Sequence, residues 1–248
     1  MRLYNIHLSL KGADYNKSVE ILYNNTGETT ATTKVSIVLG LIHMEPKERI
    51  LGKAHELFNR FGFRGVTMDE IALKSGMSKK TIYQSFLNKD ELVDAVVEEH
   101  INRSVATCEQ NCVKAENAVH EIFLNMEMMQ DLMSKLHPGI FQEMEKFFPA
   151  VFTKFFHHKN NYIFKKVQKN LEKGIEEGLF RQELNIDVIT KFRIETMFIP
   201  FNQDVFPYTR YNLTEVEIET LELYLYGIST IEGQKLIKKY KQQRIKNI

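Results

Sequence analysis

Apolar residues recur at helical spacing from residue 46 to residue 61, and this pattern predicts the first helix of the chain. The residues that share its apolar face are Ile50, Leu51, Ala54, Leu57, Phe58 and Phe61. Pro46 suits the first turn, because the N–H group that proline lacks would have no partner there. Gly62 can end the helix, since glycine readily adopts the left-handed conformation that closes many helices.

A capping box at Thr67 and Glu70 predicts a second, shorter helix. In such a box the hydroxyl and the carboxylate each bond to a backbone N–H group at the start of the helix. Ile71 and Ala72 would face inward, and Gly76 would end the helix at a tight turn.

A third helix is expected directly after that turn. Ser78 can cap its N-terminus, and Ile82 and Phe86, four residues apart, form an apolar anchor that faces inward. The anchor leaves one outward face, formed by Lys79, Lys80, Thr81, Tyr83 and Gln84. Two short helices that meet at a tight turn indicate a helix-turn-helix unit, whose second helix enters a DNA groove.

Helical spacing dominates the remainder of the chain, beginning with a helix start at Asn88 and Glu91. Further helices are expected over residues 116–136, 149–178, 187–199 and 214–231. Proline or glycine interrupts the pattern at His137-Pro138-Gly139 and at Pro200. Residues 233–248 form a basic tail that is expected to fray. The fold class is therefore all-α.

The first 43 residues differ from the rest, with a middle rich in threonine and asparagine and no sustained helical period. One interpretation is that they are an extension outside the folded domains, produced by a gene start placed too early. The other is an arm that touches the DNA minor groove or a partner. The four basic residues of this segment are too sparse to favour the arm.

The head of the chain resembles the TetR-type transcriptional regulators. Their signature is Gly-x-Ser-x-x-Thr-x-Tyr-x-x-Phe followed by Lys-[Asp/Glu]-x-Leu, after a helix capped by threonine. The matching residues are Thr67, Gly76, Ser78, Thr81, Tyr83, Phe86, Lys89, Asp90 and Leu92. The resemblance covers about residues 45–101. Ser85 departs from the histidine or tyrosine usual before the phenylalanine, which leaves the DNA sequence preference open.

The resemblance implies a helix-turn-helix DNA-binding domain over residues 44–90 and a helical effector-binding and dimerisation domain over residues 91–232. Lys79, Lys80, Tyr83 and Gln84 would then meet bases or phosphates, and Thr67, Ser78, Thr81 and Lys89 at helix starts would mainly fix the backbone. Charge agrees with this expectation. The formal net charge of the chain is +1, but residues 47–89 hold nine lysines or arginines and four acids. Such a basic segment attracts phosphates.

Composition argues against several other classes of protein. The hydrophobic content of 43% is ordinary for a globular protein, and no apolar run is long enough to cross a bilayer, so a cytoplasmic location is expected. Cys108 and Cys112, four residues apart, would be small buried hydrophobes rather than a redox sensor, since no lysine or histidine is adjacent to them in the sequence. No histidine has partners at metal-ligand spacing, so neither a metal nor a cofactor is expected.

Phenylalanine and methionine are dense in the second half of the chain, and such side chains can line an adaptable apolar pocket. The candidates for this pocket are Phe123, Met126, Met129, Met133, Phe152, Phe155, Phe156 and Arg193. The alternative is that the apolar side chains form the plain core of a helical domain. Arg193 and Glu195 would then be solvated or held in salt bridges. The resemblance adds weight to the pocket, because members of the family mostly sense small molecules there.

A seam of the coiled-coil type runs along one expected helix, through Ile218, Leu221, Leu225 and Ile228. Together with the apolar face of residues 188–199 it predicts a four-helix interface in a homodimer, as in the family. The alternative is that these residues only complete the core of one chain.

Together with these patterns, the resemblance predicts a repressor that binds a palindromic double-stranded DNA operator as a dimer and is released by a small apolar or amphipathic effector. A ligand-independent DNA-binding or partner-recruiting regulator is the alternative. An enzyme is not expected and no catalytic residue is assigned, because the sequence holds no Ser/His/Asp order and no glycine-rich phosphate loop. The sequence leaves open whether the protein represses or activates.

Overall fold

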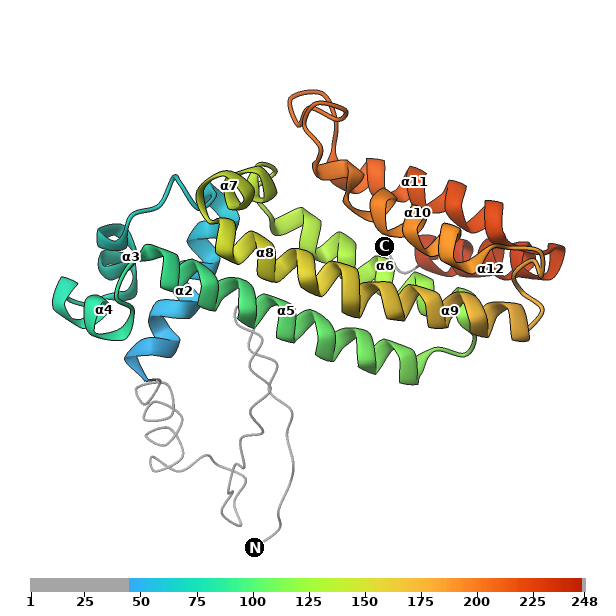
Figure 1. Ribbon diagram of the computed structural model, residues 1–248, viewed down its shortest axis with the longest axis horizontal. Helices are drawn as coiled ribbons and strands as arrows, with labels where there is room; N and C mark the ends of the chain where they lie inside the picture. Colours follow the sequence, from blue (N-terminus) through green and yellow to red (C-terminus); the bar gives the residue numbers. More distant parts are fainter. Residues whose placement is uncertain (1–44, 247–248) are drawn as a thin grey trace, which may run out of the picture. The chain divides into compact units, whose positions relative to one another are not determined.

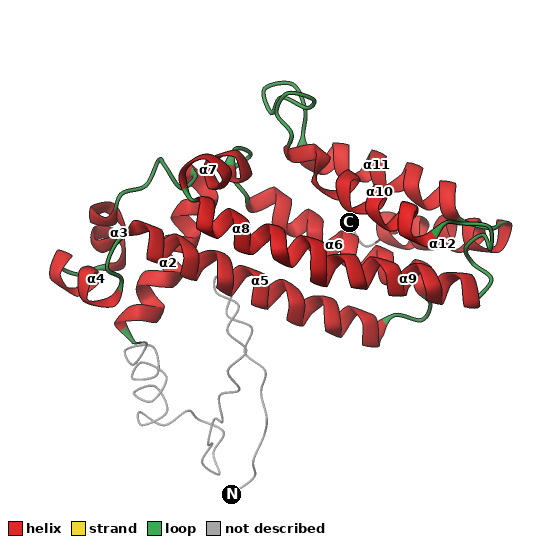
Figure 2. Cartoon of the chain, viewed as in Figure 1, coloured by secondary structure: helices red, strands yellow, loops and turns green. Residues whose placement is uncertain are grey.

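The computed structural model describes residues 45–246, and the regular elements in that range are helices (Figure 1). They are α2 (Pro46–Phe61), α3 (Met68–Ser75), α4 (Lys79–Ser85), α5 (Lys89–Lys114), α6 (Ala118–Lys135), α7 (Ile140–Phe147), α8 (Pro149–His158), the π-helix η1 (Lys159–Ile163), α9 (Phe164–Glu176), α10 (Ile186–Phe198), the 3-10 helix η2 (Ile199–Phe201), α11 (Leu213–Ile228) and α12 (Ile231–Lys246). The described range has no strand, which confirms the all-α expectation (Figure 2). None of these helices has both the length and the apolar character needed to span a membrane.

The chain divides into two compact units, residues 1–49 and residues 50–248, and the elements from Ile50 onward belong to the second unit. Residues 1–43, for which an over-extended gene start or a DNA-touching arm was considered, lie outside the described residues.

The helix signals of the head are satisfied by local hydrogen bonds. The Thr67 hydroxyl accepts a bond from the Glu70 N–H at 3.2 Å, and the Thr67 N–H donates to Glu70 Oε2 at 2.7 Å, so the capping box is confirmed. Gly76 adopts a left-handed conformation, with φ of 67°, and its N–H donates to the Leu73 carbonyl. Ser78 caps α4 by accepting a bond from the Thr81 N–H at 3.1 Å.

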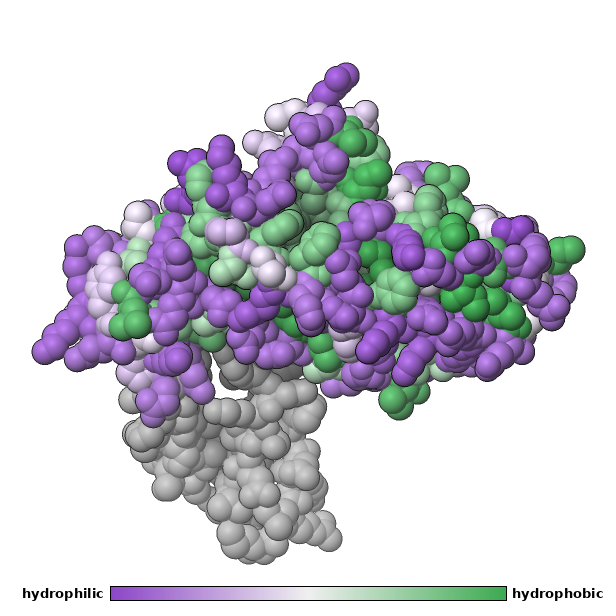
Figure 3. Space-filling model, viewed as in Figure 1, coloured by the Kyte–Doolittle hydropathy of each residue, from purple (hydrophilic) through white to green (hydrophobic). Residues whose placement is uncertain are grey.

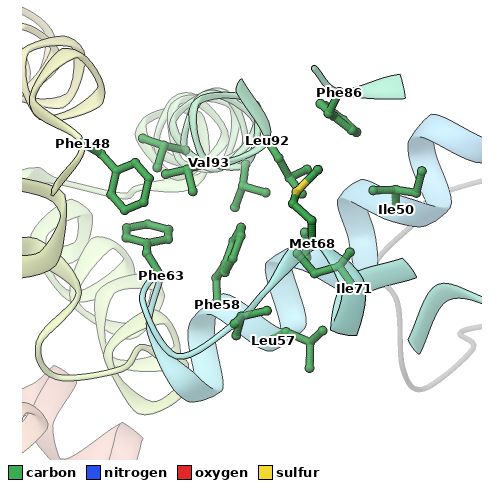
Figure 4. Close-up of a cluster of buried hydrophobic side chains, with 14 of the residues drawn as sticks. Ile50, Leu57, Phe58, Phe63, Met68, Ile71, Phe86, Leu92, Val93 and Phe148 are labelled. Carbon is green, nitrogen blue, oxygen red and sulfur yellow. The ribbon is translucent and has the colours of Figure 1, made fainter. Parts of the chain in front are cut away.

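The core of the head is shared by α2, α3, α4 and α5 and is closed by the later helices α7 and α8. Phe63 lies between Phe58 and Phe148, at ring-centre distances of 5.3 and 5.6 Å (Figure 4). Leu92 and Val93 of α5 are fully buried in the same cluster. Because α5 runs without a break from Lys89 to Lys114, it contributes both to the core of the head (residues 45–90) and to the helices that follow, residues 91–246, here called the body.

Two elements between residues 137 and 178 differ from the expected pattern. Helix α7 was not predicted from the sequence, because its eight residues are too few to show a clear period. The long helix expected from Pro149 is two α-helices joined by the π-helical turn η1. Short π-helical segments of this kind often occur at functional sites.

The expectation that residues 233–248 fray is wrong for the described part of that segment, because residues 231–246 form α12. Ile237 and Tyr240 of α12 are buried in a second core with residues of α6, α9 and α11. The Tyr240 hydroxyl accepts a hydrogen bond from Asn117 Nδ2 at 2.9 Å. Three of the basic residues that suggested a tail, Lys235, Lys238 and Lys239, are exposed on the outer face of this amphipathic helix.

The predicted coiled-coil seam mainly completes the core of its own chain. Leu221, Leu225 and Ile228 are buried in the second core, so the interpretation that they face a partner is wrong. Their spacing has the period that any buried helix face shows, and the sequence alone could not tell the two cases apart.

Candidate DNA-binding surface and ligand cavity

One face of α4 is open to solvent and the opposite face is buried. Ile82 and Phe86 are almost fully buried, as the predicted anchor requires. Lys80 and Gln84 are exposed, and 46% of the Tyr83 surface is accessible. Lys79 is exposed as well, and its ammonium group lies 2.6 Å from Asp69 Oδ2 on α3. This pair raises the pKa of Lys79, so the lysine keeps its positive charge.

The remaining candidates near this face are held by local contacts. The hydroxyl groups of Ser78 and Thr81 bond to each other at 2.9 Å, and the Thr67 hydroxyl donates to Glu70 Oε2 at 2.9 Å. Lys89 begins α5 and is partly buried, and burial lowers its pKa against the opposing effect of nearby carboxylates. The hydroxyl groups of Thr67, Ser78 and Thr81 thus hold the starts of α3 and α4.

The loop between α2 and α3 is fixed by a residue of α7. Glu143 Oε2 accepts a hydrogen bond from the Arg64 N–H at 3.0 Å, and the Arg64 guanidinium lies 4.4 Å from the centre of the Phe147 ring. The contact joins a loop of the head to a helix 79 residues later in the chain. A movement of α7 would therefore reach the helix-turn-helix unit.

A cavity of about 210 Å³ lies among the helices of the body and is partly open to solvent. A single water needs roughly 10–15 Å³ by the same kind of measure, so the cavity has room for an organic molecule. Most of its wall is apolar and comes from α5, α6, α8, α9 and α10. His55, Asn59 and Phe63 belong to α2 and the loop after it and line the same cavity. The cavity therefore extends to the first helix of the head.

Three histidines line the cavity, namely His55, His100 and His158. The rings of His55 and His100 stack with centres 6.0 Å apart. Burial, reinforced by the neighbouring His55, lowers the pKa of His100 to about 4, and burial also lowers the pKa of His55 and of His158. All three rings are therefore largely uncharged near pH 7.

A buried ion pair lies in another part of the wall. Arg193 of α10 donates from Nη2 to Glu217 Oε1 of α11 at 3.1 Å. The Arg193 guanidinium also lies 5.2 Å from the centre of the Tyr224 ring. Arg193 Nη1 and Glu217 Oε2 are buried and have no hydrogen-bond partner in the part of the chain that the structure describes.

Comparison with known proteins assigns the head to a family. Residues 50–96 match the model of the bacterial regulatory proteins of the tetR family. The HTH-type transcriptional regulator YhgD of Bacillus subtilis, which is uncharacterised, is 26% identical over 162 residues, covering 62% of this chain and 84% of that protein. The chain therefore carries a helix-turn-helix domain of the TetR family.

Solved structures of TetR-type regulators share the fold. The fatty acid degradation regulator FadR from Bacillus halodurans superposes with a TM-score of 0.58 at 20% identity, covering 73% of this chain and 95% of that one. The transcriptional regulator FadR from Bacillus subtilis, solved in complex with stearoyl-CoA, gives a TM-score of 0.55 at 16% identity, covering 73% of this chain and 98% of that one. This TetR-family protein is thus a DNA-binding transcriptional regulator with a helix-turn-helix unit.

The structure brings half of the predicted pocket residues of this TetR-family chain to the cavity. Met126, Met129, Phe155 and Arg193 line it. The other four are placed elsewhere, because residues on one helix face different neighbours. Phe123 packs against Tyr240 of α12, Met133 against Phe201 and Leu213, Phe152 against the head core, and Phe156 is partly exposed.

Several cavity residues could not be found from their sequence pattern. His55 and His100 are 45 positions apart and would have been taken for surface polar residues of amphipathic helices. Glu217 is paired with a residue 24 positions away, and Glu195 pairs instead with Lys159 at 2.9 Å. A charged residue inside an otherwise apolar helix face was the one available sequence signal, and it pointed to Arg193.

The two cysteines are half-buried, and Lys166 Nζ lies 3.7 Å from Cys112 Sγ, a neighbour that the sequence did not indicate. Both are free, and burial raises the pKa of Cys108 and, together with a hydrogen bond to Glu121, that of Cys112 to about 12. Thiols that stay protonated are poor nucleophiles. In the described residues, no three His, Cys, Asp or Glu side chains are grouped so as to hold a metal ion.

Proposed function

We propose that this TetR-family protein is a dimeric repressor whose affinity for a palindromic operator falls when a small apolar or amphipathic molecule occupies the cavity. The observation that carries the proposal is that one cavity is lined by residues of the body and by His55, Asn59 and Phe63 of the head. An occupant would touch the DNA-binding unit directly. The protein would then act in the cytoplasm, where its operator is, and without catalysis.

The DNA contacts in this proposal come from the exposed face of α4. Lys80 and Gln84 can form bidentate hydrogen bonds or charged contacts with guanine or adenine edges in a major groove, and Tyr83 can reach a base or a phosphate. Lys79 and Lys89 add positive charge beside them. The two α4 helices of a dimer would read half-sites roughly 34 Å apart.

The dimer in this proposal uses the outer faces of α10 and α11 in place of the predicted seam. Val188 and Phe192, four residues apart on α10, are 55% and 54% exposed, and Leu223 of α11 is 75% exposed. Hydrophobic residues gather on the side of the molecule where α10 and α11 lie (Figure 3). Large apolar side chains that stay exposed on adjacent helices are typical of a protein interface.

The effector role of the cavity draws support from its size, its apolar wall and the π-helical turn beside it, which contributes Tyr162 and Ile163 to the lining. A regulator of the same fold, FadR of Bacillus subtilis, was solved with stearoyl-CoA. The apolar wall of the cavity and this comparison both favour a ligand with a substantial apolar part.

The test begins with an operator selected from random DNA duplexes by the full-length protein. Operator affinity is then measured by fluorescence anisotropy with and without the apolar dye N-phenyl-1-naphthylamine. We expect the dye to bind with enhanced fluorescence and to lower the operator affinity at least fivefold. A dye that binds in the cavity and leaves the operator affinity unchanged would favour a ligand-independent regulator, and a selected site without two repeated halves would contradict the dimer.

A further inference from the structure

The charged side chains of the cavity wall limit the kind of ligand group that it can recognise. Four formally charged side chains line it, Glu121, Lys166, Arg193 and Glu217. Lys166 pairs with Glu109 at 2.6 Å, Glu121 with Lys173 at 3.5 Å, and Arg193 with Glu217. The histidines of the wall are largely uncharged near pH 7, as described above. A charged ligand group would therefore meet no unpaired charge of opposite sign.

Hydrogen bonding in the wall is less complete than charge pairing. Arg193 and Glu217 are 7% and 1% exposed, and their single mutual bond uses one nitrogen and one oxygen. Arg193 Nη1 can still donate and Glu217 Oε2 can still accept. A buried polar atom without a partner destabilises the protein, and the effect is larger where the group is charged. A ligand that supplies both partners would remove that penalty.

We infer that the Arg193–Glu217 pair is the polar anchor of the cavity, and that it selects a neutral apolar molecule bearing a group that both accepts and donates a hydrogen bond, such as an amide. The carbonyl oxygen would accept from Arg193 Nη1, and the N–H group would donate to Glu217 Oε2. Tyr224, whose ring lies against the guanidinium, lines the cavity beside this pair. The inference rests on the proposed effector role of this cavity.

Electrostatics argues against a carboxylate as the ligand group that the Arg193–Glu217 pair holds. A second anion would share a guanidinium that Glu217 already neutralises, and like charges in an enclosed apolar site repel strongly. Burial raises the pKa of Glu217, and the attraction of Arg193 opposes this shift without cancelling it. A nearby anion would raise that pKa further, whereas a donated N–H group would stabilise the ionised carboxylate.

The test uses three compounds with the same ten-carbon chain, decanamide, methyl decanoate and sodium decanoate. Each is titrated at pH 7.5 against the full-length protein carrying N-phenyl-1-naphthylamine, and displacement of the dye gives the affinity. We expect decanamide to bind roughly tenfold more tightly than the ester, which accepts but does not donate, and than the carboxylate.

The matching variant replaces the pair by apolar residues of similar size, Arg193→Met with Glu217→Leu, because exchanging a buried ion pair as a unit usually preserves the fold. This variant should still bind the dye and the ester and should lose the tenfold preference for decanamide. The control is Lys159→Met with Glu195→Leu, which removes another ion pair of α10 whose residues do not line the cavity. The control should keep the preference.

The outcomes separate this inference from the proposed function. Equal affinity for decanamide in the wild type and in the Arg193/Glu217 variant would overturn the inference, and would mean that water satisfies the pair. Tighter binding of decanoate than of decanamide would also overturn it. Selective binding of decanamide with no effect on operator affinity would support the anchor and contradict the repressor mechanism. If no compound or dye binds, both fail.

Discussion

At the scale of single residues, the exposed side chains of α4 carry the DNA-binding hypothesis. Replacing Tyr83 or Lys80 by alanine should lower operator affinity at least about fivefold, since each good base contact contributes roughly 1–3 kcal/mol. Neither side chain is buried, so the thermal midpoint should hardly change. Gel-shift titrations at two salt concentrations measure the loss, and a lysine that contacts a phosphate should also reduce the salt slope by about 1.

The control for that comparison is Lys238→Ala on α12, which removes an equal charge from an exposed position outside the head. Its operator affinity should stay near that of the wild type. If all three variants bound the operator equally well, α4 would not be the recognition helix.

A second residue-scale prediction concerns His100. Its pKa is about 4 in the folded protein and about 6.5 in an unfolded chain, so the unfolded state binds more protons between these values. Stability should therefore be greatest above pH 6.5 and should fall as the pH drops from 6.5 to 4, by roughly 3 kcal/mol from this residue. Urea unfolding at several pH values measures the slope.

The variant His100→Gln should flatten this dependence, while His157→Gln, at an exposed position on α8, should leave it unchanged. His55 and His158, whose lowered pKa values act in the same direction, would keep part of the slope. A slope that survives intact in His100→Gln would show that His100 is not kept neutral by burial.

At the scale of elements, α12 offers a direct contrast between a buried and an exposed isoleucine. Ile237→Ala should destabilise the protein by roughly 2–5 kcal/mol, because Ile237 is completely buried against the second core. Ile231→Ala at the start of the same helix should change the stability by less than about 0.5 kcal/mol, because Ile231 is 74% exposed. Thermal denaturation distinguishes them, and equal effects would return residues 231–246 to the status of a loosely attached tail.

Elements were predictable from the sequence where their signals are local. The capping box at Thr67, the turn at Gly76 and the anchor of Ile82 and Phe86 each depend on residues a few positions apart. The placement of α7 and α12 depends on contacts between distant segments, such as Glu143 with Arg64 and Asn117 with Tyr240. Helical periodicity shows that one face of a helix is buried, but it does not identify the segment that covers it.

The same limit explains which residues of the candidate site could be predicted from the sequence. The outward residues of α4 follow from the position of their buried anchor, so the sequence places them correctly on one exposed face. The cavity residues depend on how six or more helices meet, and methionine and phenylalanine at helical spacing are equally common in a plain core. Arg193 was found because a charge interrupts an apolar run, whereas its partner Glu217 became visible only with the packing of α10 against α11.

At the scale of the whole molecule, the proposed function requires that ligand and operator bindings oppose each other. Two sites that bias one conformational equilibrium change each other's affinity by the same factor, commonly about 5- to 150-fold. We therefore expect operator DNA to weaken the binding of N-phenyl-1-naphthylamine by the factor with which the dye weakens operator binding. Calorimetric titration of the dye into the free protein and into the operator complex gives both affinities.

The residue best placed to transmit this coupling is Val96 of α5, because it is buried in the head core and also lines the cavity. Val96→Ala should leave the dye and the operator able to bind separately and should change the factor by which each weakens the other. Val113→Ala, at an exposed position near the end of the same helix, is the control and should leave the factor unchanged. If the dye bound the free protein and the operator complex equally well, occupation of the cavity would not control DNA binding. The exposed face of α4 would then belong to a regulator that needs no ligand.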